Sequence, residues 1–241
     1  MAQNSYFFEL NLGSNDSVFF LTQAQPDFLM DLSDKLQQDI HRNGDGYKIS
    51  ITSDELNLLP LKTFEGKVSV ITEADKLGKV KSEIERYGIV GFDTETRPSF
   101  KRGQVYKVAL LQLAVPNKVF LIRLHHTGLP QEIASIFENP DIIKAGVAIH
   151  DDIKSLQKIT KFNPAAFVEL ATLARTSGLQ VESVKKLAGL LLGIRISKSA
   201  QTSNWEAPTL TEKQIDYAAT DAWVCLEIYC KLLKVKSYGH I

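Results

Sequence analysis

Three short acidic segments contain the residues best suited to chemistry: GFDTET at 91–96, KAGVAIHDD at 144–152 and YAATD at 217–221. Carboxylates placed side by side repel one another, and a buried carboxylate is costly unless a cation or hydrogen bonds compensate its charge. A pair of divalent cations can activate water and stabilise the leaving oxygen of a phosphodiester. The segments therefore indicate a two-cation site for phosphodiester cleavage, built from Asp93, Glu95, Asp152, Asp221 and Tyr217.

The first segment closes a predicted strand over residues 88–95. The stretch GIVGFDTE is apolar, β-branched and aromatic until it reaches the acids, which is typical of a buried strand with a polar end. Side chains two apart on a strand share a face, so Asp93 and Glu95 should point one way, and Phe92 and Thr94 the other. A strand that runs out into a solvated acidic turn is the alternative for an isolated D-x-E pattern.

The second segment predicts a buried strand over 142–149 and then a helix over 151–160. Asp151 and Asp152 open this helix. An acid in a first helical turn can cap the backbone N–H groups and complement the helix dipole, and this ordinary interpretation suits Asp151 best.

The third segment lies on a predicted helix over 212–233. Tyr217 and Asp221 are four residues apart, which on a helix stacks them on one face within reach of a common ligand. An ordinary pair at the boundary of the buried face is the alternative. The apolar stripe of this helix comprises Ile215, Ala218, Ala219, Ala222, Cys225, Ile228 and Leu232.

The same residues carry a family resemblance. Over residues 65–234 the chain resembles the DEDD 3′–5′ exonucleases of the tyrosine-bearing subgroup, the RNase D and Werner syndrome exonuclease type. The motifs are FDTE at 92–95, GVAIHDD at 146–152 and YAATDA at 217–222, supported by KVALLQLA at 107–114 and SKSAQTSNWEAPTLTEKQ at 197–214. Five stretches in the correct order make the match specific.

The resemblance implies an α/β fold of the RNase H-like type, with a mixed sheet flanked by helices on both faces. It also implies that Asp93 bridges two cations, that Glu95 and Asp221 complete one metal site, and that Asp152 holds the second cation largely through water. Tyr217 would orient or help deprotonate the attacking water. Asp151 is an extra acid beside the motif position, and Asp152 is the favoured ligand of the two.

The implied activity is metal-dependent hydrolysis of nucleic acids from the 3′ end, with release of nucleoside monophosphates. A non-catalytic module on the same fold, which binds nucleic acid or protein, is the alternative. A decayed site usually loses an acid, whereas here all four acids and the tyrosine are present, which favours catalysis.

The ligand chemistry favours Mg²⁺ or Mn²⁺ over zinc, because the motifs are rich in oxygen and form no Cys or His cluster. His150 follows the second strand and can touch metal or substrate, or serve as a hydrogen-bonded structural residue. The ordinary pKa of tyrosine, about 10, makes Tyr217 a poor base and favours a positioning task.

Candidate substrate contacts must come from local charge, because 28 basic and 28 acidic residues leave no net charge. A bound strand needs some phosphate contacts. The expected partner is a single-stranded or recessed 3′ end of DNA or RNA, and the motifs do not separate the two because the 2′-hydroxyl contact is not visible in them. Trp205 is expected to pin its loop to the core rather than to stack on a base. The weaker substrate-binding candidates are Thr94, Phe100, Lys101, Arg102, Tyr106, His150 and Lys198.

The 241 residues are long enough for one enzyme domain with an appendage. We expect an amino-terminal appendage of a hairpin and a helix at 1–48, the exonuclease domain at 49–236 and a tail at 237–241. Within the domain the pattern predicts a strand at 67–71, a hairpin formed by VALLQLAV and KVFLIRL around residues 116–117, and helices at 73–87, 130–138 and 183–192.

Cysteine usage and the amino terminus bear on the compartment. Cys225 and Cys230 are five apart on one predicted helix, which is too open a geometry for a disulfide. No basic region followed by an unbroken apolar core opens the sequence, so we expect neither a signal peptide nor a membrane span, and a cytoplasmic location by default.

Overall fold

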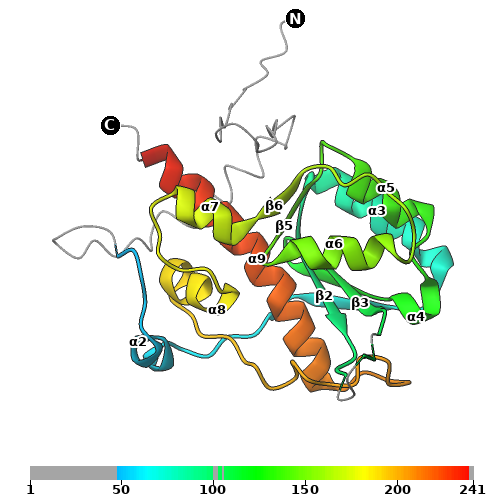
Figure 1. Cartoon of the computed structure of the whole chain (residues 1–241), viewed down its shortest axis with the longest axis horizontal. Helices are drawn as coiled ribbons and strands as arrows, with labels where there is room; N and C mark the ends of the chain where they lie inside the picture. The colour runs from blue at the N-terminus through cyan, green and yellow to red at the C-terminus, as the bar shows by residue number, and fades with distance from the viewer. Residues whose placement is uncertain (1–47, 100–102, 105, 239–241) are drawn as a thin grey trace, which may run out of the picture.

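The structure is a computed structural model that describes residues 48–99, 103–104 and 106–238 (Figure 1). The predicted appendage at 1–48 lies outside the described residues except for residue 48, and so do Phe100, Lys101 and Arg102. Within the described part, no helix has both the length and the apolar character that a membrane crossing requires.

A six-stranded mixed sheet forms the centre of the molecule, with strand order β1-β4-β3-β2-β5-β6. The central strand β3 pairs antiparallel with β2 and β4, and the remaining pairs are parallel. The predicted hairpin is confirmed as β3 and β4. The strands are β1 (Lys67–Ile71), β2 (Ile89–Thr96), β3 (Val108–Val115), β4 (Lys118–Arg123), β5 (Ile143–Gly146) and β6 (Phe167–Glu169).

Helices cover both faces of this sheet. One core contains α3, α5 and α6 together with one side of the strands, and the longest helix, α9, crosses the opposite side (Figure 1). The helices are α2 (Ser53–Leu58), α3 (Leu77–Tyr87), α4 (Leu124–Thr127), α5 (Gln131–Glu138), α6 (Ile149–Gln157), α7 (Leu170–Thr176), α8 (Val184–Leu187) and α9 (Glu212–Tyr238), with a 3₁₀ turn η2 (Ala74–Lys76) and a π turn η3 (Ala188–Leu192). The predicted fold, a mixed sheet with helices on both faces, is confirmed.

The strand β3 shows why both faces must be covered. All eight of its residues are buried, and they alternate between the two cores: Leu111 and Leu113 face α3 and α5, whereas Leu110 and Ala114 face α9. A strand that is apolar on both sides can be stable only between two layers of helices.

Contact between β2 and α9 depends on Gly91. A Cβ atom at this position would lie 2.0 Å from the carbonyl oxygen of Ala222 and 2.8 Å from the backbone nitrogen of Leu226. Small residues of α9, Ala218 and Ala222, are fully buried at the same interface. The small size of these residues lets the helix backbone approach the strand closely, and this contact sets the distance between the acids that each element carries.

The predicted boundaries of three elements were wrong: the strand at 142–149, the helix at 151–160, which runs from Ile149 to Gln157, and the helix at 212–233. The strand predicted at 142–149 ends at Gly146, because Ala148 adopts a left-handed backbone conformation with φ 58° and turns the chain into α6. Ile149 therefore begins the helix instead of ending the strand, and its backbone N–H donates to Glu169 Oε2 at 3.0 Å. The last helix continues to Tyr238, beyond the predicted end at 233.

Candidate metal centre

Three carboxylates from distant parts of the chain converge at the end of β2. Asp93 and Glu95 come from β2 and Asp221 comes from α9, and each offers a ligand oxygen within 4.8 Å of the others. The period of the strand puts Asp93 and Glu95 on one face, and the close approach at Gly91 brings α9 against that face. Asp93 and Glu95 are partly exposed, whereas Asp221 is buried.

Asp152 approaches this group from α6 but is not one of the three. Its Oδ1 accepts a hydrogen bond of 2.5 Å from the Thr94 hydroxyl, on the face of β2 opposite to Asp93. Asp152 is nevertheless close enough for its charge to raise the pKa of both Asp93 and Glu95. Thr94, a predicted substrate contact, thus fixes Asp152.

The neighbouring acid behaves differently. Asp151 is exposed, and its nearest cation is the Lys154 ammonium, 3.9 Å away on the same helix. The two adjacent aspartates therefore have different surroundings, with Asp152 directed to the end of β2 and Asp151 to solvent.

Burial and mutual repulsion raise the pKa of the clustered acids. Desolvation is the largest cause at Asp93, followed by the charges of Asp221 and Asp152, and together they hold its pKa well above the usual value despite a 2.9 Å hydrogen bond from the Thr94 backbone N–H. Burial, followed by the charges of Asp93, Asp221 and Asp152, raises the pKa of Glu95 to about 9. Without a cation, the charged forms of these carboxylates are therefore energetically unfavourable.

Asp221 and Tyr217 interact on α9. Desolvation raises the pKa of Asp221 to about 6, opposed by the Tyr217 hydroxyl and by the positive charge of Lys185. Desolvation, then the charges of Asp221 and Glu95, raise the pKa of Tyr217 above its ordinary value. Tyr217 therefore keeps its proton near neutral pH and can act by hydrogen bonding.

Trp205 lies beside the site, in the connection before α9. It is fully buried, and its ring packs against Tyr217 with 6.0 Å between ring centres, so it pins its loop as predicted. Its indole N–H is close enough to Glu95 to oppose the rise in the pKa of that carboxyl. Among the described residues, however, this N–H forms no hydrogen bond of normal geometry.

The remaining predicted contacts lie around this centre or outside the described residues. Tyr106 is partly buried, with the Arg97 guanidinium 4.9 Å from its ring centre. His150 is exposed on the first turn of α6, and Lys198 is exposed after η3.

The sequence did not point to Lys185 on α8, a partly buried cation near Asp221. Desolvation and the charge of Lys198 lower its pKa to about 8. A pair of adjacent lysines is common on exposed helices, so the sequence offered no signal that one of them faces an acid.

The donor set fits hard divalent cations. The three converging groups are carboxylates, and no Cys or His belongs to the group. Oxygen donors suit Mg²⁺ and Mn²⁺, and bound cations would compensate the charges that raise the pKa of Asp93, Glu95 and Asp221.

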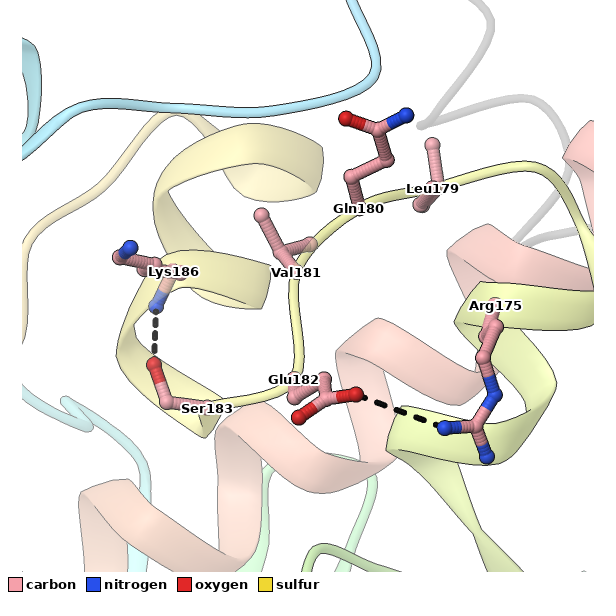
Figure 2. Close-up of a pocket in the computed structure, with 7 residues that line it drawn as sticks. All are labelled: Arg175, Leu179, Gln180, Val181, Glu182, Ser183 and Lys186. Carbon is pink, nitrogen blue, oxygen red and sulfur yellow. Dashed lines mark hydrogen bonds and ion pairs between the residues drawn. The ribbon is translucent and has the colours of Figure 1, made fainter.

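A hollow of about 500 Å³ lies elsewhere, along the connection between α7 and α8 (Figure 2). An ion pair between Arg175 and Glu182, 3.4 Å apart, crosses it, and Gln180 donates its backbone N–H to the carbonyl of Ile49 at 2.7 Å. None of the clustered acids lines this hollow, which is therefore separate from the candidate metal centre. Its lining residues are Arg175, Leu179, Gln180, Val181, Glu182, Ser183 and Lys186.

The chain is similar in sequence to known proteins. A family model described as 3′–5′ exonuclease matches residues 68–236. The chain is 35% identical over 185 residues to the mouse bifunctional 3′–5′ exonuclease/ATP-dependent helicase WRN, covering 72% of this chain and 13% of that protein. It is 34% identical over 162 residues to the Drosophila melanogaster exonuclease 3′–5′ domain-containing protein 2, covering 66% and 27%.

A solved structure has a similar fold. The Aedes aegypti Nibbler EXO domain superposes with a TM-score of 0.67 at 27% identity, covering 75% of this chain and 94% of that domain. The chain thus matches nearly all of an isolated exonuclease domain, but spans only a small part of the curated relatives' length.

Proposed function

The chain belongs to the DEDD family of 3′–5′ exonucleases, as its motifs predicted, and we propose that it hydrolyses phosphodiester bonds at nucleic-acid 3′ ends. The observation that carries this proposal is the convergence of Asp93, Glu95 and Asp221 within 4.8 Å at a position that disfavours their charges. Without a bound cation this repulsion would destabilise the cluster, whereas bound cations would compensate it.

Two cations, Mg²⁺ or Mn²⁺, are the proposed cofactors. Asp93 would contact both, Glu95 and Asp221 would complete one site, and Asp152, fixed by Thr94, would hold the other largely through water. Bound cations would activate a water molecule on one side of the phosphorus and stabilise the leaving oxygen on the other.

The chain's own residues would orient the reactants. Tyr217 keeps its proton, so its hydroxyl would position the attacking water and not deprotonate it. The water oxygen forms the new bond to phosphorus while the bond to the 3′ oxygen breaks. The products are a nucleoside monophosphate and a strand shortened by one nucleotide, whose 3′ oxygen receives a proton.

Substrate contacts form a separate part of the proposal. We assign phosphate contact to Lys198, and contact with the terminal nucleotides to Tyr106 and His150, because these side chains are at least partly exposed. Phe100, Lys101 and Arg102 remain predicted contacts. Matched DNA and RNA oligonucleotides, single-stranded or with a recessed 3′ end, would identify the preferred substrate, and cell fractionation would test the predicted cytoplasmic location.

The decisive experiment follows a labelled single strand with Mg²⁺ or Mn²⁺ present. The wild-type protein should shorten it from the 3′ end, Asp93→Asn should abolish shortening without unfolding, and Asp151→Asn should retain activity because that acid is exposed. Full activity in the Asp93→Asn protein would refute the proposal. Binding of the strand without any cleavage by the wild type would favour the non-catalytic alternative.

A further inference from the structure

Gln112 is a polar side chain enclosed in an otherwise apolar strand. It lies at the middle of β3 with no exposed surface, and neither its amide nitrogen nor its carbonyl oxygen has a hydrogen-bond partner among the described residues. A buried polar group left without a partner costs about 1–3 kcal/mol. Native proteins contain few such groups, so this one requires a reason.

Strand pairing puts Gln112 beside the metal centre. It is the direct register partner of Asp93 in the antiparallel pair of β2 and β3. Residues directly opposite in such a pair point to the same face, with Cβ atoms about 4.5–5.5 Å apart. The amide therefore lies on the α9 face next to the carboxylate that is proposed to contact both cations.

The neighbours of Gln112 along β3 and on β4 carry no hydrogen-bonding side chain on this face. Leu110 and Ala114 flank it along β3, and Leu121 is opposite on β4; all three are buried and apolar. One oxygen of Asp93 already accepts the backbone N–H of Thr94 at 2.9 Å. The second carboxylate oxygen remains for a further donor.

We propose that Gln112 is a positioning residue of the metal centre, whose Nε2 donates a hydrogen bond to Asp93 once a divalent cation orients that carboxylate. This inference rests on the proposed function. It explains why an amide is buried without a partner: its acceptor takes the required orientation only in the metal-bound protein. Hydrogen bonds that orient metal ligands are worth about 10–100-fold in metal affinity.

The test replaces Gln112 by methionine, which has a similar length and no hydrogen-bonding amide. In the full chain, Mn²⁺ is titrated by calorimetry and by thermal melting, without substrate. Gln112→Met should raise the Mn²⁺ dissociation constant by about tenfold or more, while the metal-free melting temperature stays equal or rises because two unpartnered polar atoms are removed. Leu111→Met, the adjacent buried position on the other face, is the matched control and should leave Mn²⁺ affinity unchanged.

Each other outcome also decides the matter. Mn²⁺ affinity within twofold of the wild type would overturn the positioning role and leave the proposed function intact. A metal-free melting temperature several degrees below the wild type would show that the amide already has a partner needed for folding, and would overturn the role as well. Absence of Mn²⁺ binding by the wild-type protein would instead overturn the proposed metal centre itself, and this inference with it.

Discussion

Removal of the Glu95 charge should stabilise the metal-free protein in alkaline solution. Burial and the charges of Asp93, Asp221 and Asp152 raise the pKa of Glu95 to about 9, from an ordinary value of 4.5. The folded protein thus holds a proton that the unfolded chain has lost over this interval. Folding stability falls as pH rises wherever the native state binds more protons, so Glu95 weakens the metal-free fold progressively from pH 4.5 to pH 9. Glu95→Gln keeps the size of the side chain and removes this penalty.

The size of the effect follows from the pKa difference. Each unit corresponds to about 1.4 kcal/mol, so the penalty at pH 8 is roughly 4–5 kcal/mol before relaxation and water entry, and about 2–4 kcal/mol after them. At pH 5 the same calculation gives less than about 1 kcal/mol. For a domain of this size, 1 kcal/mol moves the melting temperature by about 2–4 °C, which predicts a rise of roughly 5–15 °C at pH 8.

Thermal melting in the presence of EDTA at pH 5 and pH 8 measures this difference. Glu132→Gln, on an exposed position of α5, is the matched control and should change the melting temperature little at either pH. At pH 8, saturating Mn²⁺ should raise the melting temperature of the wild type above that of Glu95→Gln. An ion that binds only the native state stabilises it, and the glutamine variant lacks one of the carboxylates proposed to bind that ion. The reasoning fails if Glu95→Gln melts below the wild type at pH 8 in EDTA, or if its effect is the same at both pH values.

Two further predictions concern packing and a buried lysine. Gly91→Ala should destabilise the fold by about 1–3 kcal/mol and weaken Mn²⁺ binding, because the new Cβ pushes α9 and Asp221 away. Gly78→Ala, at a position on α3 with open space around it, is the control for thermal melting and for Mn²⁺ titration. Equal Mn²⁺ affinity in the two variants would contradict the prediction for Gly91. Burial lowers the pKa of Lys144, a residue of β5, to about 7. Between pH 7 and pH 10 only the unfolded chain keeps this proton, so the free energy of unfolding of the wild type should rise with pH relative to that of Lys144→Met, by up to about 1.4 kcal/mol per pH unit. Denaturant unfolding at several pH values measures this gain, and a difference independent of pH would exclude it.

Local patterns predicted the elements that carry the acids. The β2 strand, the β3–β4 hairpin and α9 were found because strand alternation, turn residues and helical spacing are properties of neighbouring residues. The short elements α2, α7 and β6 were not predicted. Six or seven residues of helix, or three of strand, give too few periodic positions to distinguish them from a loop, and they are held by packing against the larger elements.

The junction at residues 146–149 shows the same limit in one place. An apolar run continues through Ala148 to Ile149, so the sequence predicted one strand. The left-handed turn at Ala148 is imposed by the surrounding fold, in which Glu169 of β6 binds the backbone N–H of Ile149. Because of this turn, α6 begins at Ile149, Asp152 points toward β2 and Asp151 points toward solvent. Two adjacent aspartates give no sequence signal that would distinguish their orientations.

Local sequence is enough to put Asp93 and Glu95 on one face of a strand, and Tyr217 and Asp221 on one face of a helix, because the geometry of a single element sets each pair. The approach of Asp221 to Asp93 depends instead on the packing of the whole fold, since it joins segments more than a hundred residues apart through the backbone contact at Gly91. The raised pKa values of Asp93 and Glu95 also depend on packing, because the burial of these groups and the short distances between their charges arise only in the folded protein. Residue types thus supplied the carboxylates, and the packing of α9 on β2 brought them together as a candidate metal centre.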